Sequence, residues 1–226
     1  MNQFEIEIKS LLGGEEKAAD LINKMKAKDK NLVKYKSHKQ LNHYFVGGSL
    51  KDLRKNIEKL IKSADEKKKI EDMIEKAKTF SVRTRLADKK LILVIKASID
   101  DTTSANGTAR MEFESVIEGL TLDELDKLIL KSGFQYQAKW SRERTDYKYK
   151  GANVSVDKNA GYGYLAEFEK VVNDKALADG VKKELRDMMK ELEIEELAQD
   201  RLERMFAHYN AHWQDYYGTD KIFNIK

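Results

Sequence analysis

The sequence predicts an α+β fold: an eight-stranded antiparallel β-barrel forms a tunnel with a polar, charged lumen, and amphipathic helices pack outside it. Three observations lead to this prediction. Eight segments have the character of strands, and helical segments with one apolar stripe separate or follow them. In most of these strands the charged side chains recur two residues apart, so each set shares one face. The opposite faces are apolar at several of the same places, which gives the helices a surface to cover.

The amino-terminal part of the chain predicts alternating strands and helices. Apolar and charged residues alternate from Phe4 to Lys9, which is typical of a strand with two different environments. A helix is expected from Glu15 to Lys28, because its apolar residues recur at helical spacing. Leu41 to Val46 is aromatic and β-branched and predicts a second strand. The lysine-rich segment at about 49–78 predicts two helices with a break near Ser63.

Strand patterns dominate the centre of the chain. Three consecutive strands are expected over Phe80–Leu86, Leu91–Ala97 and Ala109–Val116. Thr121 and Glu124 form a capping box that opens a helix ending at Gly133. Three further strands are expected over Gln135–Tyr149, Ala152–Asp157 and Tyr162–Val172.

The chain then returns to helical periodicity from about residue 174. We interpret residues 1–226 as a single tunnel domain, with a helical insertion at about 49–78 and a helical carboxy-terminal extension at about 174–226.

Composition excludes several classes of function. The 226 residues include 43 basic and 39 acidic side chains, and a net charge of +4 is too balanced to favour nucleic acid or an anionic membrane as a partner. The absence of cysteine excludes disulfides, thiolate nucleophiles and Cys-based zinc sites. No secretion signal or run of about 18 apolar residues is present, so we expect a cytoplasmic protein without a membrane span. A homodimer is compatible with this composition.

The charged residues spaced by two are the main functional signal. For any single strand, a solvated outer face explains them as well as a tunnel lining does. Taken together, and with helices that need the apolar faces, they predict a charged lumen, which must hold water, metal and an anionic ligand. The charged sets are Glu5, Glu7 and Lys9; Arg83 and Arg85; Arg110, Glu112 and Glu114; Arg142 and Arg144; and Glu167 and Glu169.

The mixture of signs indicates a particular kind of ligand. Paired carboxylates suit Mg²⁺ or Mn²⁺, which bridge phosphate oxygens. Arginine and lysine neutralise the remaining phosphate charge, and arginine can do so through two parallel hydrogen bonds. The sequence therefore predicts a metal-assisted site for a small-molecule polyphosphate, in which positioning and charge stabilisation supply most of the rate.

The ordered motifs resemble one known family, the CYTH domain or triphosphate tunnel metalloenzymes. Residues 5–9 resemble the family's opening E-x-E-x-K, and residues 161–169 resemble its closing G-x-(F/Y)-x-E-x-E element. The motifs between them occur in the family's order: Arg83 and Arg85, Lys96, Glu112 and Glu114, Arg142 and Arg144, and Asp157. Two positions depart from the pattern, because Asn42 stands where aspartate is usual and Arg142 where lysine is usual.

The resemblance implies roles for individual residues. The expected metal ligands are carboxylates at the two ends of the strand series: Glu5, Glu7, Glu167 and Glu169. Two carboxylates between them, Glu112 and Asp157, are further candidates. Substrate binding falls to the cations Lys9, Arg83, Arg85, Lys96, Arg142 and Arg144. Glu5, Glu7 and Lys9 are the expected catalytic residues, and Lys9 is the one expected to assist the attacking or leaving oxygen.

Three functions fit these motifs. The first is a divalent-metal-dependent triphosphatase acting on inorganic triphosphate or on a nucleotide or thiamine ester. The second is a class IV-type adenylyl cyclase, in which the ribose 3′-hydroxyl attacks the α-phosphorus of ATP and pyrophosphate leaves. The third is a polyphosphate- or nucleotide-binding module without catalysis, which the retention of both E-x-E pairs and Lys9 disfavours.

The histidines predict no metal site. His208 and His212 share one face of a predicted helix, but Tyr209 stands where a zinc protease would carry glutamate. We expect this pair to lie at the surface or in packing, and the aromatic residues around it to dock the last helix onto the barrel.

Overall fold

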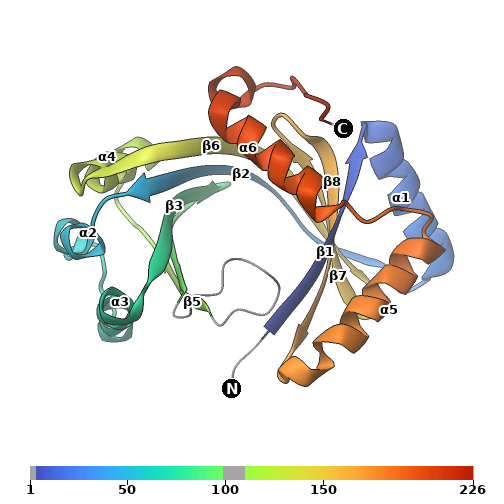
Figure 1. The fold of residues 1–226 in the computed structure, drawn as a ribbon, viewed down its shortest axis with the longest axis horizontal. Coiled ribbons are helices and arrows are strands. Elements are labelled where there is room, and N and C mark those ends of the chain that lie inside the picture. The colour runs from blue at the N-terminus through green and yellow to red at the C-terminus, as the bar shows by residue number, and fades with distance from the viewer. Residues whose placement is uncertain (1–3, 99–109, 226) are drawn as a thin grey trace. The chain divides into compact units, whose positions relative to one another are not determined.

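The computed structural model describes residues 4–98 and 110–225, which form eight strands and six α-helices (Figure 1). All eight strands belong to one sheet in the order β1-β8-β7-β6-β2-β3-β4-β5, and the described pairings are antiparallel. This confirms the predicted α+β class. The strand order ends at β1 and at β5, so among the described residues hydrogen bonds do not close the sheet into the predicted barrel. The strands are β1 (Phe4–Gly13), β2 (Val33–Gly47), β3 (Thr79–Ala87), β4 (Lys90–Ser98), β5 (Arg110–Val116), β6 (Phe134–Tyr149), β7 (Ala152–Asn159) and β8 (Gly163–Val172).

The chain divides into two compact units, and the interpretation as one tunnel domain stays a prediction. Unit 1 contains residues 1–39 and 141–226, and unit 2 contains residues 40–140. Strands β2 and β6 contribute residues to both units. Each unit has its own apolar core.

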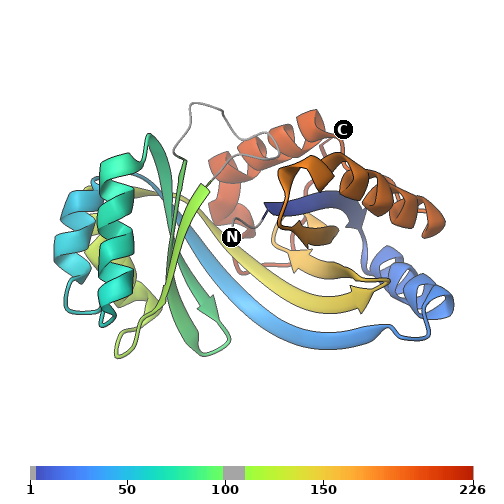
Figure 2. The ribbon, with the colours of Figure 1, turned by 90° about the horizontal axis from the view of Figure 1, so that it is seen from below.

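In unit 1, helices cover the apolar face of β1 and β8. These helices are α1 (Glu15–Lys28) and α5 (Ala178–Glu191), the latter preceded by a 3₁₀ turn over Lys175–Leu177 (Figure 2). Ile6, Ile8 and Phe168 are buried there with Leu21 and Leu185. Because neighbours along a strand point to opposite faces, burying Ile6 and Ile8 turns Glu7 and Lys9 to the uncovered side. The prediction that these apolar faces pack under helices is confirmed.

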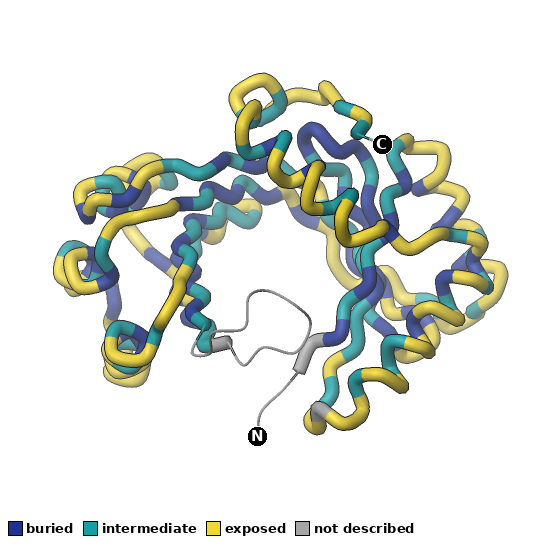
Figure 3. The backbone as a smooth tube through the Cα atoms, in the orientation of Figure 1, coloured by how far each residue is buried: buried dark blue, intermediate teal, exposed yellow. Residues whose placement is uncertain are grey.

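In unit 2, three helices cover the sheet in the same way. They are α2 (Leu50–Ile57), α3 (Ala64–Lys76) and α4 (Leu122–Lys131), and they pack over β3 and β5 and on one another. Phe113 and Val82 are fully buried beneath them, and each such side chain contributes roughly 1.5–3 kcal/mol by leaving water. Figure 3 shows buried backbone along the strands and exposed backbone along the outer sides of the helices.

Hydrogen-bonded caps explain where the helices of unit 2 begin. The Ser49 hydroxyl accepts from the Asp52 amide at 3.3 Å, and the Ser63 hydroxyl accepts from the Glu66 amide at 3.4 Å. Thr121 opens α4, and its reciprocal capping box with Glu124 is present as predicted.

Strand β2 is longer than the sequence indicated, since it begins at Val33 rather than at Leu41. Its first residues are exposed, so they lack the alternation of burial by which a strand is recognised. Pairing with β6 holds them instead, as the Ser37 hydroxyl contact with Thr145 at 3.1 Å and the Lys39 ion pair with Glu143 at 2.8 Å show.

The carboxy-terminal part of the chain folds back onto unit 1 after α6 (Gln199–Tyr216). The turn before β8 is held there at Gly161: the Gly161 amide donates to the Lys221 carbonyl at 3.2 Å, and the Phe223 amide donates to the Gly161 carbonyl at 2.8 Å. His208 and His212 lie in the adjoining aromatic cluster, with ring centres 4.7 Å apart and His208 packed on Phe223. Among the described residues, no helix is long and apolar enough to cross a membrane.

One close backbone approach fixes the end of the β1 and β8 pair. Gly163 has φ +72°, and a Cβ atom placed there would lie 2.2 Å from the Gly13 carbonyl oxygen. Only glycine fits such a contact without moving the backbone. The register that follows from this end determines which side chains of β1 and β8 face each other.

Candidate functional site

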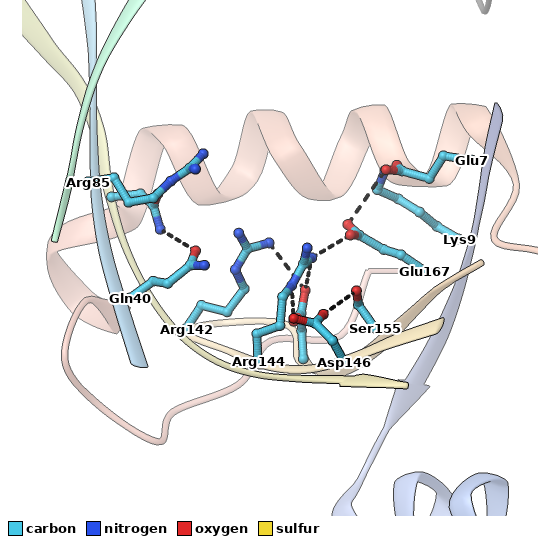
Figure 4. Close-up of polar contacts among 11 residues, drawn as sticks. Glu7, Lys9, Gln40, Arg85, Arg142, Arg144, Asp146, Ser155 and Glu167 are labelled. Atoms are coloured by element: carbon cyan, nitrogen blue, oxygen red, sulfur yellow. Dashed lines mark hydrogen bonds and ion pairs between the residues drawn. The ribbon is translucent and has the colours of Figure 1, made fainter. Parts of the chain in front are cut away.

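The polar face of unit 1 contains a row of side chains that crosses four neighbouring strands. Lys9 on β1 is the register partner of Glu167 on β8, and Glu167 is the partner of Ser155 on β7. Ser155 in turn is the partner of Asp146 on β6 and donates its hydroxyl to the Asp146 carboxylate at 2.7 Å (Figure 4). Because register partners lie on the same face of a sheet, these residues form one continuous polar row.

Two further rows flank this one. On one side Glu7 is the register partner of Glu169, and Glu169 is the partner of Asn153, whose amide nitrogen lies 3.4 Å from the Glu169 carboxylate. On the other side Arg144 is the partner of Asp157. The three rows therefore place the glutamate carboxylates on β1 and β8, and the guanidinium group of Arg144 on β6.

Arg144 is the most tightly held cation of this face. Its Nε donates to Asp157 Oδ1 at 2.7 Å and its Nη2 donates to Asp157 Oδ2 at 2.6 Å, a bidentate pair, and Nη2 also contacts Glu167 (Figure 4). Arg142 Nη1 donates to the same Asp157 carboxylate at 3.2 Å. Burial by itself would lower the pKa of Arg144, but hydrogen bonding to Asp157 and the charges of Asp157 and Glu167 raise it. Arg144 therefore stays charged, and Asp157 fixes the direction of both guanidinium groups.

Lys9 and Glu167 connect Glu7 on β1 with Arg144 on β6 through a chain of ion pairs. Lys9 Nζ forms an ion pair with Glu7 and lies 3.6 Å from Glu167 Oε1. Burial would raise the pKa of Glu167, but the positive charges of Arg144, Lys9 and Arg142 outweigh it, so the pKa is lowered. Glu167 is therefore ionised at neutral pH and available as an anionic ligand.

Unit 2 has a polar face of its own on β2 to β5. Asn42 and Arg85 are register partners, and Arg85 Nε donates to Asn42 Oδ1 at 3.0 Å. Arg85 also reaches Glu114, at 3.4 Å. The Arg83 guanidinium lies over the ring of its own partner Tyr44, 4.6 Å from the ring centre.

The remaining predicted residues of unit 2 form a pair. Lys96 and Glu112 are register partners on β4 and β5, with Lys96 Nζ 2.9 Å from Glu112 Oε1.

Arg83 differs from these residues of unit 2, because its Nε is buried without a hydrogen-bond partner among the described residues. A buried donor of this kind suits an anionic ligand.

The predicted site residues thus fall into two groups. Unit 1 brings together Glu7, Lys9, Arg142, Arg144, Asp157, Glu167 and Glu169, and unit 2 brings together Arg83, Arg85, Lys96 and Glu112. The side chain of Glu5 lies outside the described residues, although its backbone pairs with Val171.

Carboxylate oxygens are the donors that Mg²⁺ and Mn²⁺ prefer, so the donor set of unit 1 fits such an ion. Glu7, Glu167 and Glu169 supply these oxygens on two adjacent strands, β1 and β8. Within residues 4–98 and 110–225, no three His, Cys, Asp or Glu side chains are gathered closely enough to ligate a metal. Glu7 and Glu167 instead contact the ammonium group of Lys9.

Sequence reasoning missed several polar residues of these faces. Asp146 follows Arg144 by two residues and Ser155 precedes Asp157 by two, so the same alternation that identified the arginines could have identified both. Tyr44 likewise follows Asn42 by two. Ser155 and Tyr44 are uncharged and give no charge signal, whereas Asp146 continues the charged set of Arg142 and Arg144 and could have been predicted.

The fold and the polar faces together define the class of protein. It is an α+β protein with one antiparallel sheet, helices over its apolar face and a mixed-charge set of carboxylates, arginines and lysines on the other. The CYTH domain family model matches residues 3–201, and the chain belongs to this family. Enzymes of the family act on triphosphates and generally use divalent metals.

Solved structures show the same fold at low sequence identity. A conserved hypothetical protein from Pyrococcus furiosus is 18% identical with a TM-score of 0.56, covering 86% of this chain and 92% of its own. A protein from Vibrio parahaemolyticus, provisionally named an adenylate cyclase, is 12% identical with a TM-score of 0.58, covering 92% and 99%. The Hippeastrum protein HpAC1 is 18% identical with a TM-score of 0.50, covering 88% and 95%. No curated protein matches this chain significantly.

Proposed function

We propose that this protein is a divalent-metal-dependent triphosphatase that releases phosphate from inorganic triphosphate or from an organic triphosphate such as a nucleotide or thiamine ester. The observation that carries the proposal is the polar face of unit 1. It sets three carboxylates beside three cations on adjacent strands, and the opposite face is covered by helices. A polyphosphate with its metal ion is the small ligand that both signs of charge would satisfy together.

The residues divide into two tasks. Glu7, Glu167 and Glu169, with Glu5, would hold Mg²⁺ or Mn²⁺, and the ion supplies neutralisation of phosphate oxygens and a template for the reacting groups. Glu112 and Asp157 remain the further metal-binding candidates that the resemblance names, although Asp157 already accepts hydrogen bonds from two arginines.

Arg142, Arg144 and Lys9 would bind the phosphate chain. The bidentate pair with Asp157 fixes the orientation of the Arg144 guanidinium group, so Arg144 loses less side-chain entropy when it binds a phosphate oxygen. Lys9 would donate a hydrogen bond from its Nζ to the attacking or leaving oxygen. Its Nζ is positioned for this role by the carboxylates of Glu7 and Glu167. Binding of the triphosphate by Arg83, Arg85 and Lys96 rests on the sequence motifs and, for Arg83, on its unpaired buried Nε.

In the proposed hydrolysis, water attacks the terminal phosphorus and the bond to the bridging oxygen breaks. The negative charge that develops on the leaving oxygen is stabilised by cations already in place, which lowers the barrier without covalent participation of the protein.

A cyclase reaction is the second candidate. The Hippeastrum protein HpAC1 is provisionally named an adenylyl cyclase, and it is described as having a dominant triphosphatase activity. The two reactions share a triphosphate and differ in the attacking group and in the phosphorus attacked, so their products separate them.

A product assay tests the proposal. Inorganic triphosphate, ATP and thiamine triphosphate are offered separately with Mg²⁺ or Mn²⁺, and phosphate, pyrophosphate and cyclic AMP are resolved. Phosphate release that stops with a chelator is the expected result. Cyclic AMP with pyrophosphate would replace the proposal by the cyclase reaction, and tight binding without turnover would replace it by a binding module.

Matched variants connect the activity to the site. Glu7→Gln with Glu169→Gln removes two carboxylate charges from adjacent strands, and we expect turnover to fall at least about 100-fold because metal binding weakens. Glu16→Gln with Glu195→Gln removes the same charge from exposed positions and should leave turnover unchanged. Full activity in the first double variant would contradict the metal assignment.

A further inference from the structure

A buried polar cluster lies behind the arginines of unit 2. Asp126 on α4 is 1% exposed and accepts three hydrogen bonds, all of them from residues of the sheet. His43 Nδ1 lies 2.6 Å from Asp126 Oδ2, and the Thr84 hydroxyl donates to Asp126 Oδ1 at 2.7 Å. The Tyr136 hydroxyl donates to Asp126 Oδ2 at 2.7 Å. No local pattern predicted this cluster, because its members come from four separate elements.

The cluster holds a cross-strand pair. His43 on β2 and Thr84 on β3 are register partners, and a single carboxylate from the covering helix binds both. His43 is 2% exposed and Thr84 is fully buried, so water cannot replace a lost contact. Burial would raise the pKa of Asp126, but hydrogen bonds from His43, Thr84 and Tyr136 outweigh it and the pKa is lowered. The carboxylate is therefore charged as it binds the two strands.

The next register pairs on either side belong to the opposite, polar face. One pair is Asn42 with Arg85, joined by the 3.0 Å hydrogen bond to Arg85 Nε. The other is Tyr44 with Arg83, joined by the 4.6 Å contact between guanidinium and ring. Each arginine thus contacts a β2 side chain, and both contacts depend on the distance between β2 and β3. The Asp126 carboxylate adds a side-chain link between β2 and β3 at the register pair that lies between these two contacts.

We propose that Asp126, acting through His43 and Thr84, is the positioning residue that fixes Arg83 and Arg85 for phosphate binding. It touches neither the ligand nor the arginines. It ties β2 and β3 together at the one register pair that both arginines flank. The role in phosphate binding rests on the proposed function, whereas the effect on the arginine side chains does not.

The test compares Asp126→Asn with Asp123→Asn. Both changes remove one charge from α4, but Asp123 is exposed, whereas Asp126 is buried and bonded to the strands. We expect Asp126→Asn to weaken binding of inorganic triphosphate about tenfold, short of the roughly 100-fold effect of a 1 Å misplacement. Binding is measured by calorimetry in a chelator, and kinetics should show a raised KM with kcat nearly unchanged, the pattern of lost ground-state binding. Asp123→Asn should match the wild type.

A second readout needs no ligand. The Arg85 Nε–H group is hydrogen-bonded to Asn42, so its side-chain NMR signal should be protected from solvent exchange in the free protein. Asp126→Asn should speed that exchange, and Thr84→Val, which keeps side-chain size and removes one of the three donors, should do so to a smaller extent. Folding of each variant is checked by circular dichroism.

The outcomes are separable. Folded Asp126→Asn protein with wild-type affinity and wild-type Arg85 exchange would overturn the positioning role. Changed exchange with unchanged affinity would also overturn it, because the arginines would then not bind the phosphate chain in the way proposed. Wild-type protein that binds no triphosphate would overturn the proposed function instead. If Asp126→Asn does not fold, Thr84→Val decides the question by the same two measurements.

Discussion

Replacing Arg144 with methionine should destabilise the protein more than any change at an exposed ion pair. The substitution keeps most of the apolar stem and removes the guanidinium, which leaves Asp157, itself 1% exposed, without its bidentate partner. Breaking a buried ion pair costs about 3–5 kcal/mol in unfolding free energy, because the remaining charge loses its compensation. Arg142 still lies 3.2 Å from the Asp157 carboxylate, so we expect the lower end, about 3 kcal/mol.

Chemical denaturation measures this loss directly. For a chain of this size, about 3 kcal/mol corresponds to a fall in Tm of roughly 6–12 °C. Transitions followed by circular dichroism and by tryptophan fluorescence should coincide in each protein. The free energies of unfolding of the wild type and of Arg144→Met can then be compared. Arg186→Met is the matched control: its partner Glu196 is at the surface and the Arg186 side chain is 54% exposed, so the cost should stay within about 1 kcal/mol.

A double-mutant cycle isolates the pair. Combining Arg144→Met with Asp157→Asn should recover part of the loss, with a coupling energy of at least about 1 kcal/mol, since the second change removes the unpaired charge. Refutation is direct: if Arg144→Met costs under about 1 kcal/mol, solvent reaches Asp157 and the argument from burial is wrong.

Two further predictions concern binding and acid stability. Arg83→Ala should raise KM for the triphosphate at least about tenfold with the fold intact, because it removes a cation proposed to bind phosphate, and the Nε of this cation has no hydrogen-bond partner within the described ranges. Steady-state kinetics measure the change, and an unchanged KM and kcat would exclude Arg83 from the site. Glu167 has a folded-state pKa below its unfolded value, so its contribution to stability is present above the unfolded pKa and is lost as the pH falls through the folded pKa. The wild type should therefore lose more stability than Glu167→Gln on acidification below about pH 4.3, and parallel curves in denaturation at stepped pH would contradict this.

Much of the fold follows from short-range patterns. The alternation in Phe4–Lys9 and the capping box at Thr121 are local signals, and both elements formed where they were expected. The start of β2 at Val33 could not be predicted in this way, because β6, far along the chain, provides the partner strand. Charge alternation placed Arg144 and Glu167 each on the charged face of its own strand, but their contact depends on strand order, which no local pattern encodes.

The cluster around Asp126 marks the limit of such reasoning. In sequence, Asp126 is one more acidic residue among the charged positions of an amphipathic helix. Its burial depends on which strands α4 covers and on the angle at which the helix lies, both of which are tertiary properties. The candidate site residues could be predicted because charged residues recur in ordered sets along several strands, a repetition that a single buried carboxylate lacks.

The contact between Gly161 and the segment Lys221–Phe223 also determines the order in which unit 1 can be completed during protein synthesis. A growing chain that has already exposed β7 and β8 still lacks the two partners of Gly161 in the turn between them, although Ser141 is already present to bind the Ala160 amide. At ribosomal speed, the partners of Gly161 emerge on the order of several seconds after it. The Gly161 contacts before Glu167 and Glu169 are thus among the last of unit 1 to form, and a chain interrupted before Lys221 would lack them.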